Sequence, residues 1–174
     1  MIGTLLVILL AYATLIAIPF VPGIEIGISL LMLKGADIAP MVYLATVLGL
    51  TLAFTLGRIT PYRWIRSTLA DLRMRRASSL FERLEPMSRE ERLAVLMERV
   101  PGWAKPIIGG GRYLLIAALL NIPGNAVIGG GGGIAFIAGF SRLYRPWLTF
   151  AVIALAVLPV PLTVWLTGTE ALSK

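Results

Sequence analysis

Two stretches that each contain a Pro-Gly pair decide the fold: Pro19-Phe20-Val21-Pro22-Gly23 and Asn121-Ile122-Pro123-Gly124-Asn125. Each of them interrupts a run of apolar residues. Proline lacks a backbone N–H and clashes with the preceding helical turn, and glycine leaves the backbone loose, so a helix is expected to break at both points. Within hydrocarbon, such a break is tolerated only where it lines a polar cavity or packs inside protein. We therefore predict that each apolar run folds as a re-entrant helical hairpin.

The composition around these breaks is that of a membrane protein. The chain has 174 residues, of which 57% are hydrophobic and 14% are charged, whereas roughly a quarter of the residues of a soluble domain are charged. Residues 40–57 and 146–166 contain no charged side chain. Since about 20 apolar residues cross a bilayer, we predict an all-α membrane protein with two full crossings.

The two halves of the sequence follow the same order. Each has an apolar arm, a Pro-Gly break, a second apolar arm, a short polar turn and a long apolar span. We predict one membrane domain over residues 1–174, with a first repeat at 1–57, a linker at 58–106 and a second repeat at 107–174. Because each half would cross the membrane once, the second repeat would be inverted relative to the first.

The linker carries most of the charge. It contributes most of the basic excess behind the net charge of +7, and it lies between two apolar regions. This distribution is typical of a cytoplasmic loop and argues against nucleic-acid binding. Leucines at helical spacing between residues 65 and 84 predict one amphipathic helix, and a capping box of Ser88 and Glu91 predicts the start of another. These helices either lie in solvent or rest on the anionic inner leaflet.

With the linker inside the cell, the basic residues divide unequally between the two sides of the membrane. Arg112, Arg142 and Arg145 join the linker on the inner side, while Lys34 and Lys174 remain outside. Such a bias follows the positive-inside rule. We predict a multi-pass protein of the cell inner membrane with its central loop in the cytoplasm.

These motifs resemble the DedA superfamily, also called the SNARE-associated Golgi protein or VTT-domain family. The resemblance covers roughly residues 15–165 and rests on Pro22-Gly23-Ile24-Glu25, on the apolar span that ends at Arg58, and on the second break with the glycine-rich stretch after it. It implies two facing re-entrant hairpins and translocation of a membrane lipid or a lipid-phosphate carrier. It also implies a functional acidic residue, which Glu25 matches. Where the family's second motif carries arginines beside its proline, this chain has Asn121 and Asn125.

The candidate pathway residues are those of the two breaks: Pro22, Gly23, Glu25, Asn121, Pro123, Gly124 and Asn125. An ionisable group within a membrane segment is functional by default, so Glu25 could couple transport to protons. It could equally stabilise the start of the helix after Pro22, where the helix dipole favours an anion.

Other polar and glycine residues allow two interpretations each. The asparagines could bind a polar headgroup or satisfy broken backbone. The glycines at 129–133 favour close helix packing over a phosphate cradle. The arginines at 112, 142 and 145 could attract anionic headgroups or simply anchor the topology.

Function is predicted as membrane transport, with translocation of a lipid or lipid-phosphate carrier as the leading hypothesis. A small-solute or ion transporter and a non-transporting membrane assembly protein are the alternatives. The chain has no Cys and no His, which removes the usual nucleophile–base pairs and the commonest transition-metal ligands, so we expect neither an enzyme nor a metal or cofactor site. The expected partners are membrane lipids, and a homo-oligomer is left open.

Overall fold

The computed structural model describes residues 2–61, 87–99, 101–102, 105–109, 111–122 and 124–168. Every regular element in these ranges is helical, which confirms the all-α prediction for the described part of the chain. The chain divides into two compact units, one of Met1–Arg58 with Tyr113–Lys174 and the other of Ile59–Arg112. The helix predicted between residues 65 and 84 lies outside the described residues.

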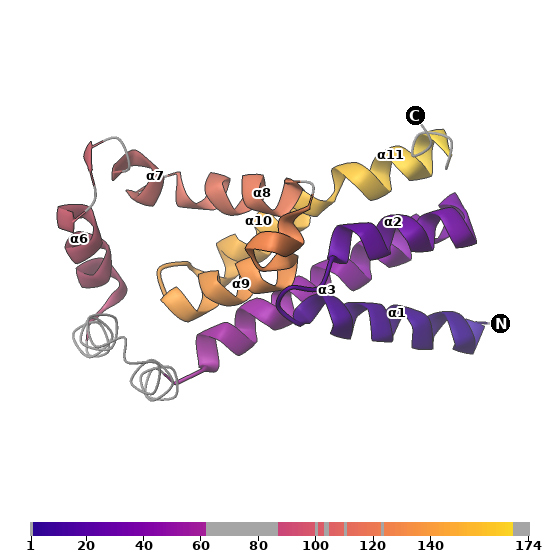
Figure 1. Ribbon diagram of the computed structural model, residues 1–174, viewed down its shortest axis with the longest axis horizontal. Helices are drawn as coiled ribbons and strands as arrows, with labels where there is room; N and C mark the ends of the chain where they lie inside the picture. Colours follow the sequence, from indigo (N-terminus) through magenta and orange to yellow (C-terminus); the bar gives the residue numbers. More distant parts are fainter. Residues whose placement is uncertain are drawn as a thin grey trace. The chain divides into compact units, whose positions relative to one another are not determined.

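The first half of the larger unit contains three α-helices and one 3-10 turn. They are α1 (Ile2–Ala17), α2 (Gly23–Lys34), η1 (Ala36–Ile38) and α3 (Ala39–Ile59). The first apolar run is thus broken, as predicted, between Ala17 and Gly23. After the break the chain reverses, so that α1 and α2 form a helical hairpin (Figure 1).

The second half of the larger unit also contains a break, and there a 3-10 helix follows it. Its elements are α8 (Arg112–Asn121), η3 (Asn125–Ile128), α9 (Gly130–Ser141), α10 (Pro146–Val157) and α11 (Pro159–Thr167). Gly129 has φ +118° and Gly130 has φ +67°, values that L side chains rarely adopt, which explains why glycine stands at the sharp entry to α9. Pro159 follows directly on Leu158, where α10 ends and α11 begins.

Two segments are long and apolar enough to cross a membrane. They are Ala36–Ile59, with 24 residues and a mean hydropathy of 1.8, and Pro146–Thr167, with 22 residues and a mean hydropathy of 2.2. They correspond to the spans predicted at 40–57 and 146–166. The inverted relation of the two halves and the side of the membrane on which each end lies stay predictions.

Glycines allow the helices of this unit to approach one another closely. A Cβ at Gly49 would lie 2.5 Å from the carbonyl oxygen of Ala13 on α1. Gly57 and Gly139 likewise meet backbone atoms across the contact between α3 and α9. Small residues at such contacts are the usual device for packing helices where lipid removes the hydrophobic driving force.

The smaller unit contains α6 (Arg89–Arg99) and α7 (Lys105–Gly109). The backbone N–H of Ser88 donates to Oε2 of Glu91 at 2.6 Å, and the N–H of Glu91 donates to Oγ of Ser88 at 3.3 Å. This reciprocal pair confirms the capping box. The hydrogen bonds from Ser88 hold the pKa of the Glu91 carboxyl below its usual value of 4.5.

Candidate functional site

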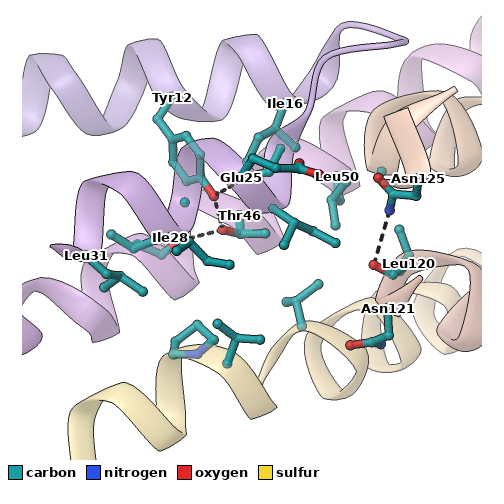
Figure 2. A pocket seen from close by; sticks show the side chains of 18 residues that line it. Tyr12, Ile16, Glu25, Ile28, Leu31, Thr46, Leu50, Leu120, Asn121 and Asn125 are labelled. Atoms are coloured by element: carbon teal, nitrogen blue, oxygen red, sulfur yellow. Dashed lines mark hydrogen bonds between the residues drawn. The ribbon is translucent and has the colours of Figure 1, made fainter. Parts of the chain in front are cut away.

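The two breaks contribute to the wall of one cavity of about 370 Å³ (Figure 2). Gly23 and Glu25 come from the first break and its helix, and Asn121, Asn125 and Gly131 come from the second. The rest of the wall comes from α1, α3 and the junction of α10 with α11. Most of the lining is apolar or glycine, and its polar side chains are Tyr12, Glu25, Thr46, Asn121 and Asn125.

Tyr12 ties three helices together on one side of this cavity. Its side chain is only 3% exposed, and its hydroxyl lies 3.2 Å from the carbonyl oxygen of Gly23 and 3.1 Å from Oγ1 of Thr46. Thr46 in turn donates to the carbonyl oxygen of Val42 at 2.7 Å. The hydroxyl sits directly over Gly27, where any side chain would collide with it. Gly27 is therefore the residue that makes room for the link between α1, α2 and α3.

Glu25 lies in the first turn of α2 and lines the cavity. Within the described part of the chain, no hydrogen-bond donor or cation contacts its carboxylate; the one hydrogen bond of this residue beyond the helix ladder is made by its carbonyl oxygen, which accepts from Oγ of Ser29 at 2.8 Å. The position favours an anion because the N-terminus of a helix carries a partial positive charge. Both interpretations of Glu25, helix stabilisation and a role in the cavity, are compatible with this placement.

The two asparagines use their amide N–H groups on backbone. Nδ2 of Asn121 donates to the carbonyl oxygens of Ala117 at 2.8 Å and of Ala156 at 2.9 Å. Nδ2 of Asn125 donates to the carbonyl oxygens of Leu119 and Leu120, at 3.4 Å and 3.3 Å. Asn125 therefore donates to carbonyl groups that the break leaves open at the end of α8, and Asn121 links α8 to the carbonyl of Ala156 on α10, so both amides are used on backbone.

The glycine-rich stretch packs against the first break. The N–H of Phe20 donates to the carbonyl oxygen of Gly129 at 2.6 Å. A Cβ at Gly130 would lie 2.5 Å from the carbonyl oxygen of Val21, and one at Gly132 would collide with that of Ile16. Gly130 and Gly132 thus allow close packing, as predicted, and the first break lies directly against the glycine-rich stretch that follows the second.

The remaining predicted residues lie elsewhere. Pro22 is exposed at the start of α2 and Gly124 is exposed with φ +71°, and neither lines the cavity. Pro123 lies outside the described residues. The three predicted headgroup arginines, Arg112, Arg142 and Arg145, do not line it either.

Two of these arginines belong to the end of the larger unit where α3 and α9 finish and α10 begins. Arg142 ends α9, Arg145 precedes α10, and Nη1 of Arg58 donates to the carbonyl oxygen of Tyr144 at 3.2 Å. The N–H of Arg145 donates to the hydroxyl of Tyr113 at 3.1 Å. We name Arg58, Arg142 and Arg145 the basic end of the unit.

Tyr12 and Thr46 are cavity residues that the sequence did not reveal. Each is one of several hydroxyl residues within a long apolar run, and a helical hydroxyl usually bonds the carbonyl four residues earlier, as Thr14 does with Leu10 at 2.8 Å. The one available signal was that Tyr12 lies eleven positions before Gly23, on the opposite arm of the predicted hairpin.

No family model, curated protein or solved structure matches this chain. Among the described residues there is also no cluster of three or more acidic side chains that could hold a metal ion. The cavity and its five polar side chains therefore carry the functional argument.

Proposed function

We propose that this protein moves a membrane lipid between the two leaflets, with the cavity at the two breaks as the polar part of the path. The observation that carries the proposal is that a single cavity joins Glu25 and the two asparagines within a set of apolar helices. A lipid that changes leaflets must take its polar headgroup across hydrocarbon. A mixed apolar and polar cavity between broken helices lowers that barrier.

Exposed apolar side chains support a lipid environment. In the most apolar windows of the two long segments, only 44% and 22% of the residues are buried, so these helices are not the enclosed core of a soluble protein. Leu48, Leu155 and Leu166 are 63%, 69% and 71% exposed. An apolar surface of this extent on a soluble monomer would be an aggregation liability.

Two tryptophans support a full crossing by α10 and α11. Trp147 and Trp165 are 66% and 58% exposed and lie near opposite ends of the segment Pro146–Thr167. At a rise of 1.5 Å per residue their spacing corresponds to about 27 Å, close to the thickness of the hydrocarbon core of roughly 30 Å. Tryptophan is enriched at both membrane interfaces.

The orientation is part of the proposal. The basic end gathers Arg58, Arg142 and Arg145, while the turn before α3 carries Lys34 together with Asp37. By the positive-inside rule the basic end would face the cytoplasm. The arginines there would attract anionic headgroups to the inner surface rather than bind them in the cavity.

Membership of the DedA superfamily also stays a proposal. Its support is the pair of Pro-Gly breaks, the acidic residue after the first of them and the contact between the first break and the glycine-rich stretch after the second. Among the described residues the cavity wall has no cation, which favours a zwitterionic phospholipid over a lipid-phosphate carrier as substrate, because a phosphate without an ammonium group of its own would meet Glu25 and no positive charge.

Translocation can be measured on the purified protein in liposomes that contain a lipid with a fluorescent acyl chain. A reductant added outside quenches the outer leaflet, and loss of the protected inner signal reports translocation. We expect faster loss than in empty vesicles, and we expect Val160→Trp to slow it because Val160 lines the cavity.

The matched control is Leu155→Trp, which adds the same ring to a position that is 69% exposed on the same spanning segment. It should leave the rate unchanged. Equal rates for protein-containing and empty vesicles, for every lipid class tried, would refute the proposed function.

A further inference from the structure

In the described part of the chain, the polar atoms of the cavity wall that are left without a partner are acceptors. At Asn125 the amide is oriented by its surroundings, because Nδ2 faces the carbonyl oxygens of Leu119 and Leu120. Only the NH₂ group of an amide can donate to two carbonyls. Oδ1 is therefore turned away from them, and this atom is buried without a hydrogen-bond partner in a side chain that is 1% exposed.

Asn121 follows the same rule. Its Nδ2 donates to Ala117 and Ala156, so its Oδ1 is also left as an acceptor. In Figure 2, Oδ1 of Asn125 lies on the side of the residue that faces Glu25, across the cavity from Leu31.

The two hydroxyls add no free donor. Tyr12 and Thr46 together have two protons, and their oxygens and the carbonyls of Gly23 and Val42 make three contacts within hydrogen-bond distance. Both protons can thus be used among these contacts. Of the described residues that line the cavity, none is a cation, and the polar groups with no proton to donate are the carboxylate of Glu25 and the amide oxygens of the two asparagines.

We propose that this cavity binds a primary ammonium group, with Glu25 as its counter-charge and Oδ1 of Asn125 as the acceptor of one of its N–H hydrogen bonds. An ammonium group supplies three donors and a positive charge, which complements an anionic site made of acceptors. The apolar remainder of the wall suits the alkyl part of the same molecule. The inference rests on the proposed function and specifies the substrate class of its site.

A primary ammonium can reach the cavity from two sources: the headgroup of an aminophospholipid or a free aliphatic amine. A quaternary ammonium has the charge but no N–H group, so it would leave Oδ1 of Asn125 unpaired. A phosphate with no ammonium group in the same molecule would add an acceptor and a negative charge to a site that already has both. These differences predict an order of affinity that can be measured without any variant.

The test is a calorimetric titration of the purified full chain in detergent micelles with hexylamine, hexyltrimethylammonium and hexyl phosphate. We expect hexylamine to bind, hexyltrimethylammonium to bind roughly tenfold more weakly for want of a charge-assisted hydrogen bond, and hexyl phosphate not to bind. Glu25→Gln should weaken hexylamine roughly tenfold or more.

Asp37→Asn provides the matched control, because it makes the same change of charge at an exposed position outside the cavity. It should leave the affinity for hexylamine unchanged. Binding of hexyl phosphate at least as tight as that of hexylamine would overturn the proposal, and so would an unchanged affinity in Glu25→Gln.

Liposomes that contain fluorescent lipids with an ethanolamine, choline or glycerol headgroup distinguish the lipid headgroup from a free amine as the source of the ammonium group. They also test lipid translocation separately from the ammonium site. Inhibition of ethanolamine-lipid translocation by hexylamine assigns the site to a headgroup, whereas hexylamine binding without effect on any lipid assigns it to a free amine. If no lipid is translocated but hexylamine binds through Glu25, the proposed function fails and the ammonium site stands. If all three lipids move at equal rates and hexylamine does not bind, the ammonium site alone fails.

Discussion

Replacing Gly27 with alanine should destabilise the protein, and removing the hydroxyl of Tyr12 should reverse the sign of that effect. A Cβ at Gly27 collides with Oη of Tyr12, while the next ring atom, Cζ, is at 3.4 Å, an ordinary contact. The collision therefore involves the hydroxyl alone. That hydroxyl is held by Gly23 and Thr46, so it cannot move away without losing hydrogen bonds.

The expected magnitudes follow from these contacts. In Gly27→Ala, overpacking and the lost hydrogen bonds cost about 2–3 kcal/mol, offset by about 1 kcal/mol from the higher helix propensity of alanine. The net cost is about 1–2 kcal/mol. Tyr12→Phe alone should cost about 1–2 kcal/mol for its hydrogen bonds. In the Tyr12→Phe background no hydroxyl opposes the new methyl group, so Gly27→Ala should be neutral or stabilising by up to about 1 kcal/mol.

The assay is a double-mutant cycle of reversible unfolding in mixed detergent micelles, with the four proteins compared under one condition. A coupling free energy of about 2 kcal/mol is expected between the two positions. An equal cost of Gly27→Ala in the presence and absence of the hydroxyl would show that Tyr12 does not occupy the space above Gly27, and the assignment of this wall of the cavity would be wrong.

Two further predictions concern the packing of the breaks and the capping of α6. Gly132→Ala should destabilise the protein by more than about 2 kcal/mol, because the methyl group would collide with the carbonyl oxygen of Ile16, and backbone cannot move aside. Gly3→Ala is the control and should not destabilise the protein, because a Cβ at Gly3 would have nothing within 4 Å. Equal unfolding midpoints for the two variants would refute the contact at Gly132. The lowered pKa of Glu91 means that the stabilisation of α6 is complete above about pH 4.5 and is lost as the pH falls through the lowered value. The protection of the Glu91 amide against exchange, relative to its intrinsic rate at each pH, should fall over that range in the native protein and be low at every pH in Ser88→Ala. A protection that does not change with pH in the native protein would contradict the capping box.

The elements of the fold were predictable where a local rule decides them. The Pro-Gly pairs break helices regardless of their neighbours, and Ser88 and Glu91 start a helix through bonds that span three residues. Uncharged stretches long enough to cross a bilayer predicted the two long apolar segments. Each of these features depends on backbone chemistry within one or two turns, which the sequence displays directly.

The cavity was predictable only in part, because its wall depends on which helices meet. Glu25 and the asparagines stand out as polar residues at a break. Thr46 does not, since its hydroxyl bonds Val42 as any helical threonine does, and only the approach of Tyr12 makes it part of the site. Gly131 is one of five consecutive glycines, and sequence alone does not distinguish the one that lines the cavity from those that contact the first break.

The backbone groups around the breaks have their own partners, and this makes the remaining polar atoms of the cavity informative. The N–H of Phe20 is satisfied by Gly129 across the two halves, and the carbonyls of Leu119 and Leu120 at the end of α8 accept from the amide of Asn125. Once the backbone needs are met, Glu25 and Oδ1 of Asn125 are still present and have no partner in the described chain. At Asn125, which is 1% exposed, an apolar side chain would avoid the cost of burying an unpaired acceptor, whereas Glu25 is exposed and bears no such cost. Because backbone satisfaction accounts for the donors of Asn125 but not for its buried oxygen, that oxygen is best explained by a ligand that donates hydrogen bonds to it.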